Sequence, residues 1–235
     1  QKPKIRLIWV YPAHMTYAEG MFAQPLIKFF QERCGPYAIW IKYRFGHLKY
    51  LQSKRPQEQD WWGIDFTSFD AYLPAWLIRD AFQIIRDLFD FSKYQFWGEP
   101  THEHTLPRLW NKIVEYFLNT PIRFQNGRVL VKHQGVPSGS YFTGIIDSVC
   151  NAIVTHYCTK GLLKNNPRFF LGDDSLFSLP NGCLTLKGFA NEAKQVFGCM
   201  INPEKCEVGK FVSFLGYKMD PSGVPMASYE KLMAQ

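Results

Sequence analysis

Two adjacent aspartates, Asp173 and Asp174, follow an apolar run that ends in a glycine, and a second apolar run comes after them. This pattern predicts a hairpin of two buried strands with both carboxylates at its tip. Carboxylates so close together repel each other unless a cation lies between them. Far upstream, Asp65 ends another strand-like run, and Asp70 precedes a helix-like pattern. The four aspartates together favour a magnesium site for phosphoryl transfer.

A two-metal arrangement is the most specific chemistry that these spacings allow. Asp65 would share a divalent ion with Asp173, and two ions about 3.5–4 Å apart would activate an attacking hydroxyl and neutralise a leaving pyrophosphate. Each position taken alone also fits a simpler interpretation, with Asp70 as a helix cap and Asp173 and Asp174 as a polar turn.

A glycine-containing loop, Gly135–Ser140, lies between these segments and leads into a long apolar helix pattern. Glycine lets a backbone approach a sugar-phosphate closely, and a helix N-terminus attracts an anion. Ser138, Thr143 and Asn151 are therefore candidate ribose contacts. The same loop would also serve as an ordinary helix N-cap.

The composition is that of a globular and moderately basic chain. Of 235 residues, 46% are hydrophobic, and 27 Lys and Arg against 20 Asp and Glu give a net charge of +7. A polyanionic partner fits this balance but is not required by it. The six cysteines show no zinc spacing, and no apolar run is long enough to cross a membrane. We expect a soluble, intracellular protein without a membrane partner and, because Met is absent at position 1, a piece of a longer polypeptide.

Helical and strand-like patterns alternate along the chain. We expect helices over 16–30, with a capping box at its start and a break or kink at Pro25, and over 73–89, 105–118, 141–161 and 186–197. Strands are expected over 61–66 and in hairpins near 122–131, 169–178 and 206–219, the first hairpin with a two-residue Asn126-Gly127 turn. Because hairpins join several strand pairs, the predicted fold class is α+β, an antiparallel sheet with helices packed on one face.

In chain order, these motifs resemble the right-handed palm of viral RNA-dependent RNA polymerases, and most closely the partitivirus-like group of double-stranded RNA viruses. Asp65-x4-Asp70 is similar to motif A, Ser138-Gly139-x3-Thr143 to motif B, and Gly172–Asp174 to motif C. The resemblance covers nearly the whole chain. It implies a right-hand polymerase palm with partial fingers.

The resemblance implies RNA-templated RNA synthesis, in which a nucleotide is transferred from an NTP to an RNA 3′-hydroxyl and pyrophosphate leaves. Two Mg²⁺ ions, or Mn²⁺ in their place, would be held by Asp65, Asp173 and Asp174. Lys205, in a segment similar to motif D, would be the fourth catalytic residue and protonate the pyrophosphate, with Lys194 as the alternative.

The resemblance also implies a set of nucleotide-binding residues. A basic strand similar to motif F would grip the triphosphate, Asp70 would sense the 2′-hydroxyl, and motif B would position the ribose. Asp147 stands where many members of the family have Asn, and Asn151 is a candidate for part of that role. The set comprises Lys4, Arg6, Asp70, Ser138, Gly139, Thr143, Asp147 and Asn151. A hairpin similar to motif E, with Phe214, Leu215 and Gly216, would support the primer.

A division into five segments follows from the same resemblance. Residues 1–60 would be a fingers-derived segment with the basic strand, 61–90 palm motif A and its helix, 91–135 a fingers-type insertion, 136–220 palm motifs B to E, and 221–235 the start of a truncated thumb or tail. RNA template, nascent RNA and NTPs would be the partners, with a viral capsid protein as a further one. The implied location is the host cytoplasm or the virion interior.

Two alternatives remain open at this stage. Reverse transcriptases share the palm but usually carry an aromatic gate where this chain has Asp70, so Asp70 and the Ser-Gly-x3-Thr loop favour RNA synthesis. A catalytically silent RNA-binding or capsid-associated module would also suit the positive charge and the aromatic residues.

Overall fold

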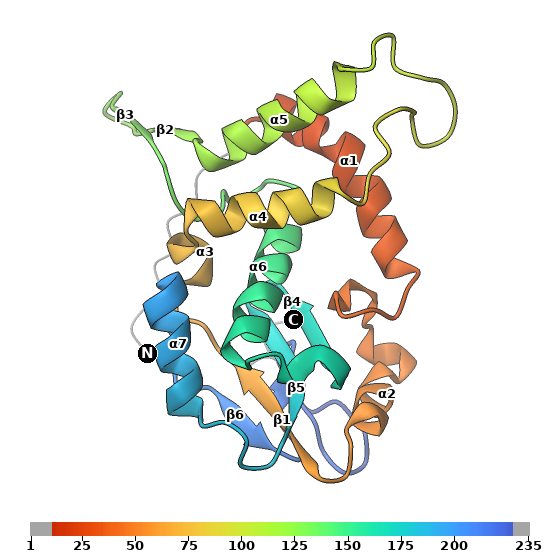
Figure 1. The fold of residues 1–235 in the computed structure, drawn as a ribbon, viewed down its shortest axis with the longest axis vertical. Coiled ribbons are helices and arrows are strands. Elements are labelled where there is room, and N and C mark those ends of the chain that lie inside the picture. The colour runs from red at the N-terminus through yellow and green to blue at the C-terminus, as the bar shows by residue number, and fades with distance from the viewer. Residues whose placement is uncertain (1–10, 228–235) are drawn as a thin grey trace.

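The centre of the computed structural model, which describes residues 11–227, is a four-stranded antiparallel sheet with the strand order β4-β5-β1-β6 (Figure 1). Strands β4 and β5 form the predicted hairpin, and β1, from far upstream, pairs with β5 on its other side. The strands are β1 (Gln59–Ile64), β4 (Arg168–Leu171), β5 (Asp174–Pro180) and β6 (Glu207–Gly209).

Helices cover one face of this sheet, as the sequence predicts. α6 contacts β4, a ring of α7 stacks on a ring of β5, and α4 packs on α6 and α5 (Figure 1). The larger helices are α1 (Ala13–Gln31), α4 (Ala75–Arg86), α5 (Thr105–Leu118), α6 (Thr143–Cys158) and α7 (Leu186–Phe197). The bounds of α5 and α7 agree with the sequence prediction, while α4 and α6 are shorter at both ends.

The two faces of the sheet belong to two separate cores. Successive strand residues point to opposite faces, so Trp62 joins the large helical core and Trp61 joins a smaller one. The smaller core buries the second face under short elements, which are η1 (Ala38–Trp40), η2 (Tyr43–Phe45), α2 (His47–Lys54), β7 (Ser213–Phe214) and β8 (Tyr217–Lys218). The α+β class is confirmed, and the face opposite the main helices is covered rather than open.

The prediction for the start of α1 was wrong. The helix begins at Ala13, directly after Pro12, whose φ of −64° suits a helix entry, so Thr16 lies inside the helix and is not its cap. Pro25 also lies within α1, which continues to Gln31. Glu19 therefore has a role other than capping.

Two hairpins differ in detail from the predictions. In the hairpin of β2 (Pro121–Arg123) and β3 (Val129–Val131), Phe124 accepts a bond from Gly127 and donates one to Arg128, which gives a three-residue loop with a left-handed Gly127. At the chain's end, β6 pairs with β1, and the hairpin is β7–β8 alone. Two short helices were not predicted. They are the one-turn helix α3 (Phe69–Tyr72) and the short 3-10 helix η3 (Leu162–Asn165).

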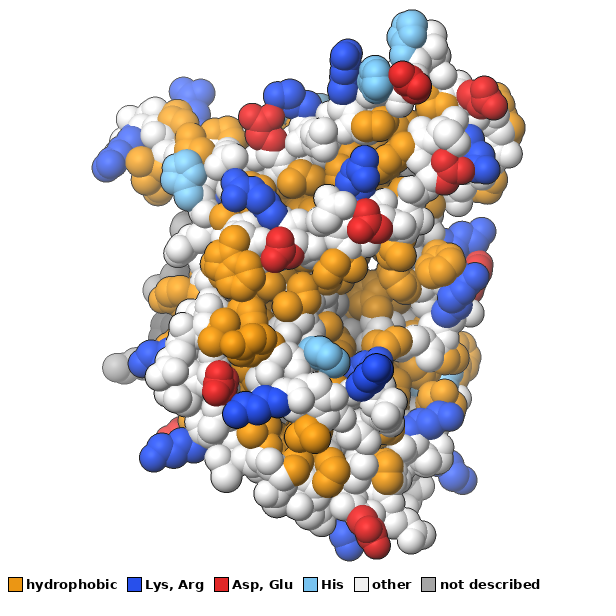
Figure 2. All heavy atoms as spheres, viewed as in Figure 1, with side chains coloured by type: hydrophobic (Ala, Val, Ile, Leu, Met, Phe, Trp, Pro, Cys, Tyr) orange, Lys and Arg blue, Asp and Glu red, His pale blue; other side chains and the backbone are white. Residues whose placement is uncertain are grey.

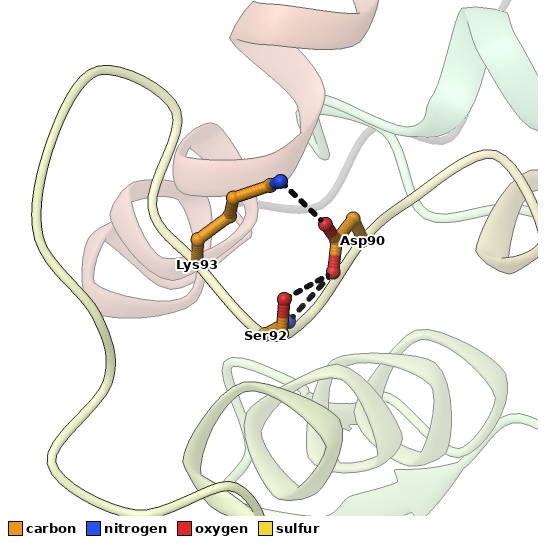
Figure 3. A network of polar contacts seen from close by, with 3 residues as sticks. All are labelled: Asp90, Ser92 and Lys93. Atoms are coloured by element: carbon orange, nitrogen blue, oxygen red, sulfur yellow. Dashed lines mark hydrogen bonds and ion pairs between the residues drawn. The ribbon is translucent and has the colours of Figure 1, made fainter.

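A long loop joins α4 to α5, and its first turn is held by Asp90 (Figure 3). The Asp90 carboxylate accepts bonds from the backbone and hydroxyl of Ser92 at 3.0 and 2.6 Å, and forms an ion pair with Lys93 at 3.0 Å. The Ser92 bonds, followed by Lys93, lower the pKa of Asp90 to about 2. These exposed contacts hold only the first turn of the loop.

The helical face of the molecule carries a broad hydrophobic surface over α4 and α6 (Figure 2). Ile84, Leu88 and Tyr157 are each about half exposed there, and a cavity of about 600 Å³ opens beside them. Among residues 11–227, none of the helices is both long and apolar enough to cross a membrane.

Candidate active site

The end of β1 and the tip of the β4–β5 hairpin lie side by side. Ile64, the last residue of β1, pairs with Ser175, so one further step of the antiparallel register brings Asp65 opposite Asp174. Directly opposed Cα atoms in such a pair are about 4.5–5.5 Å apart. The fold thus brings the end of the Asp65 strand beside the turn that bears Asp173 and Asp174, although the two are widely separated in the sequence.

The backbone at Asp65 is fixed by the segment that leads to β6. The Asp65 carbonyl accepts a bond from the Asn202 amide at 2.9 Å, and its amide donates to Cys206 Sγ at 3.3 Å. The Asp65 side chain is half-buried. Lys205 lies exposed in the same turn, whereas Lys194 is exposed in the last turn of α7. Lys205 therefore lies in the turn that contacts the Asp65 backbone.

The turn that bears Asp173 is held by side chains of α6. Ser148 accepts a bond from the Gly172 amide at 2.7 Å, and Asn151 donates to the carbonyls of Gly172 and Asp173 at 3.1 and 3.0 Å. Gly172 has a left-handed φ of 63°, which suits a tight turn. We call these three bonds the turn clamp. Both Asp173 and Asp174 are left exposed at the tip.

The roles of Asn151 and Ser148 in the structure differ from those that the sequence predicts. Asn151 is fully buried, and its carbonyl accepts a bond from Thr155 at 3.1 Å. Both of its amide hydrogens go to the hairpin, so the structure gives it a positioning role in place of a direct ribose contact. Ser148 was not predicted, because a serine on a helix face gives no signal of what it will meet across the fold.

Asp147 is a buried carboxylate of α6, the helix that bears Ser148 and Asn151. It is 4% exposed, and among the described residues its Oδ1 has no hydrogen-bond partner. Burial raises the pKa of Asp147 well above its usual range, and the nearby charges of Asp70 and Asp173 raise it further. Asp70 and Asp173 therefore both lie within electrostatic reach of Asp147.

The Asp70 segment and the loop before α6 are joined by backbone bonds. The Val136 amide donates to the Asp70 carbonyl and the Gly135 amide to the Leu73 carbonyl, both at 2.8 Å. Gly135 has φ +73°, and a Cβ there would lie 2.6 Å from the Asp70 carbonyl oxygen. Ser68, just before α3, also has a left-handed φ of 51°. Close approach and a strained backbone fix Asp70 relative to the loop.

The predicted loop residues lie at the start of α6. Gly139 has φ +90°, Ser138 is half-buried, and the Thr143 hydroxyl donates to the Pro137 carbonyl at 2.6 Å. The loop is held from outside by Glu19 of α1, which accepts bonds from Ser140 and Tyr141. Sequence reasoning missed this function of Glu19, since nothing in the local pattern connects α1 with a loop so far along the chain.

The β7–β8 hairpin approaches the same side of the molecule. Its turn residues Leu215 and Gly216 both have positive φ, of 51° and 74°, and Phe214 is buried. Tyr43 donates to the Phe214 carbonyl at 2.7 Å. Burial raises the pKa of Tyr43, and the charge of Asp174 adds to that shift, so Asp174 lies within electrostatic reach of this hairpin. Lys4 and Arg6 lie outside the described residues.

The carboxylate oxygens at this site fit a divalent cation by their chemistry, although the side chains do not already form a group of three ligands. Asp65, Asp173 and Asp174 offer only oxygen ligands, as Mg²⁺ and Mn²⁺ require. In the part of the chain that the structure describes, no three Asp, Glu, His or Cys side chains already form a ligand group.

Comparisons with known proteins agree on one family. A family model described as viral RNA-dependent RNA polymerase matches residues 1–232. The RNA-directed RNA polymerase of Cryptosporidium parvum virus 1 (strain KSU-1) is 32% identical over 180 residues, which are 74% of this chain and 32% of that protein. The RNA-dependent RNA polymerase of a human picobirnavirus has a similar structure, with a TM-score of 0.77 and 18% identity over 96% of this chain and 42% of that one. An insertion-loop deletion mutant of that polymerase gives the same TM-score, over 43% of its chain. This chain spans about a third of the curated relative and about two fifths of the solved structures.

Proposed function

Because the chain belongs to the viral RNA-dependent RNA polymerase family, we propose that it carries the catalytic palm for RNA-templated RNA synthesis. The pairing of β1 with β5 supports this most directly, since it puts the end of the Asp65 strand beside the Asp173–Asp174 turn. The observed α+β fold supports a palm with part of the fingers, with the five segments expected from the sequence.

In this proposal Asp65, Asp173 and Asp174 hold two divalent ions, Mg²⁺ or Mn²⁺. Such ions, when bound, lower the pKa of a primer 3′-hydroxyl and neutralise charge on the transferring phosphoryl group. Exposure of the hairpin tip leaves Asp173 and Asp174 accessible to a ligand, and the turn clamp from α6 holds their backbone in place. A turn whose backbone is already held reduces the reorganisation needed in the transition state.

Nucleotide selection falls to the residues around Asp147. Asp70 contacts the 2′-hydroxyl, Ser138, Gly139 and Thr143 position the ribose and the template, and Asp147 supports Asp70 from within the core. Lys4 and Arg6 neutralise the triphosphate. The influence of both Asp70 and Asp173 on the buried Asp147 supports one shared subsite.

Two further parts complete the proposed reaction. Lys205 donates a proton to pyrophosphate as it leaves, which its place in the Asp65-linked turn supports. The hairpin of Phe214, Leu215 and Gly216 supports the primer end, which fits the influence of Asp174 on Tyr43. RNA template, nascent RNA and NTPs are the proposed partners, a capsid protein is a further one, and replication takes place in the host cytoplasm or inside the virion.

The test is templated incorporation of a labelled nucleotide into a primed RNA in the presence of Mg²⁺ or Mn²⁺. We expect incorporation by the wild-type chain and none by Asp173→Ala, because removal of a metal ligand removes the charge stabilisation of the transition state. Asp90→Ala is the matched control, since it deletes an exposed carboxylate in the α4–α5 loop. Normal turnover by Asp173→Ala would overturn the metal assignment. A wild-type chain that binds RNA without turnover would favour the silent RNA-binding module.

A further inference from the structure

Glu19 is a fully buried carboxylate of α1 whose bonds lead to the loop before α6. Its Oε2 accepts bonds from the Ser140 hydroxyl at 2.7 Å and the Tyr141 amide at 3.0 Å, and its Oε1 accepts one from the Tyr11 hydroxyl at 2.7 Å. Among the described residues it forms no ion pair. Burial raises the pKa of Glu19, while the three bonds oppose that shift.

α1 also packs on Tyr141 and forms a hydrogen bond to it at the end of this loop. A Cβ at Gly20 would lie 3.3 Å from the Tyr141 ring, and the Gln24 side chain donates to the Tyr141 hydroxyl at 3.2 Å. Ser140, bonded to Glu19, also accepts a bond from the Phe142 amide at 3.0 Å. Two successive turns of one helix thus hold the two residues that directly follow Gly139.

Burial of a carboxylate without a cation costs free energy, and an apolar residue at such a site often gives an equal or greater stability. Stability alone therefore explains Glu19 poorly. An acceptor of three bonds explains it better, because it fixes the position and direction of Ser140 and Tyr141, which a hydrophobic contact would not specify.

We propose that Glu19 is a positioning residue that fixes the Ser138–Gly139 loop in the conformation that receives the ribose of the incoming nucleotide. This proposal rests on the proposed function. It assigns to α1, outside the palm motifs, control over how well the nucleotide subsite is formed before any substrate arrives.

The experiment compares three variants of the chain with the wild type. Glu19→Ala removes the acceptor. Glu19→Gln keeps a carbonyl for Ser140 and Tyr141 and presents its amide to the Tyr11 hydroxyl oxygen, which can accept. Leu26→Ala is the matched control, since Leu26 is buried on the same helix in the main core and its truncation destabilises the fold without touching the loop.

The first readout is amide hydrogen exchange over residues 138–143, which needs no activity. We expect Glu19→Ala to speed exchange there by roughly tenfold or more, in line with the loss of bonds to a charged acceptor, and Glu19→Gln to stay near the wild type. Leu26→Ala should affect this segment no more than the rest of the core. Unchanged exchange over 138–143 in Glu19→Ala would overturn the proposal.

The second readout is the steady-state kinetics of nucleotide incorporation. We expect Glu19→Ala to raise KM for the NTP by roughly ten- to a hundredfold, with a smaller change in kcat, and Glu19→Gln to restore it. Faster exchange with unchanged KM would show a purely structural bond and overturn the functional part. A wild-type chain that fails to incorporate nucleotides would instead contradict the proposed function, while the exchange result would still decide whether Glu19 holds the loop.

Discussion

At the scale of single residues, Asp70 and Asp147 differ in what the fold lets them do. Asp70 is exposed at the start of a helical turn, and its backbone is fixed by the loop before α6. Asp147 is buried within electrostatic reach of Asp70 and has an oxygen that no described residue satisfies. Asp70 can therefore meet a ligand directly, and Asp147 can act on that ligand only from behind or through Asp70.

Replacement of Asp70 by Ala should mainly reduce ribose selection. The site would lose a hydrogen-bond acceptor for the 2′-hydroxyl, so the ratio of kcat/KM for an NTP to that for its dNTP should fall by at least about tenfold, as one lost bond of this type predicts. Single-nucleotide incorporation with paired NTP and dNTP substrates measures this ratio, with Asp90→Ala as the control. An unchanged ratio would remove Asp70 from the ribose contacts.

Lys132 bonds to the loop before α6, and its burial should make the free energy of unfolding depend on pH. Its ammonium donates to the Gly135 and Leu118 carbonyls at 2.7 and 3.3 Å, and burial lowers the pKa of Lys132 to about 8. An exposed lysine titrates near 10.4, so between these values the unfolded chain binds more protons than the folded one. The free energy of unfolding should therefore rise with pH across this window through Lys132.

The variant Lys132→Met isolates this contribution. The difference in free energy of unfolding, wild type minus variant, should be lowest below about pH 8 and should increase towards about pH 10, because the burial cost of the charge disappears as the folded lysine loses its proton. Urea unfolding at matched pH values measures the difference. A constant difference across this range would mean that Lys132 is not desolvated in the folded chain.

At the scale of elements, the turn clamp joins α6 to the hairpin that bears Asp173. Removal of one buried partner leaves backbone groups of the turn unsatisfied, at a cost of about 1–3 kcal/mol. We expect Asn151→Ala to lower kcat by roughly ten- to a hundredfold, since a small displacement of a reacting geometry has effects of this size. Nucleotide incorporation and thermal unfolding, measured together, separate the two effects.

Thr159→Val is the matched control for the turn clamp. Thr159 is the buried residue directly after α6, and its hydroxyl donates to carbonyls of that helix, at 2.8 and 3.1 Å. Its replacement should lower stability to a similar degree and leave kcat near the wild-type value. Equal losses of kcat in Asn151→Ala and Thr159→Val would mean that the clamp matters only for folding.

Elements with a strong local pattern could be predicted from the sequence, and elements made by distant contacts could not. The apolar spacing of 105–118 and 186–197 predicted α5 and α7 well, and the apolar runs around Gly172 predicted the β4–β5 hairpin. The pairing of β6 with β1 and the turn of α3 were missed, because both depend on partners far away in the chain. Within the site, the aspartates were found by their spacing, whereas Glu19 and Ser148 have no local signal at all.

At the scale of the whole molecule, few of the basic side chains in the described part of the chain pair with a carboxylate. The chain has a net charge of +7, and the described residues contain two ion pairs between a lysine and a carboxylate, Lys93–Asp90 and Lys112–Glu115, both on the exposed surface. Most Lys and Arg side chains of the described part are therefore not neutralised by a carboxylate within 4 Å. This distribution fits a chain that meets a polyanion over a wide area.

Binding of single-stranded RNA should therefore weaken steeply with salt. Each phosphate contact to a single strand contributes a slope of about −0.7 in log K against log salt, so a footprint of several phosphates predicts a slope of roughly −2 to −4. Fluorescence anisotropy with a labelled single-stranded RNA measures this slope in the absence of divalent ions. The variant Asp173→Ala should bind RNA at least as well as the wild type, because it removes a negative charge without removing a cation. A slope near zero would mean that base stacking rather than charge supplies the affinity, and the basic surface would then have no part in RNA binding.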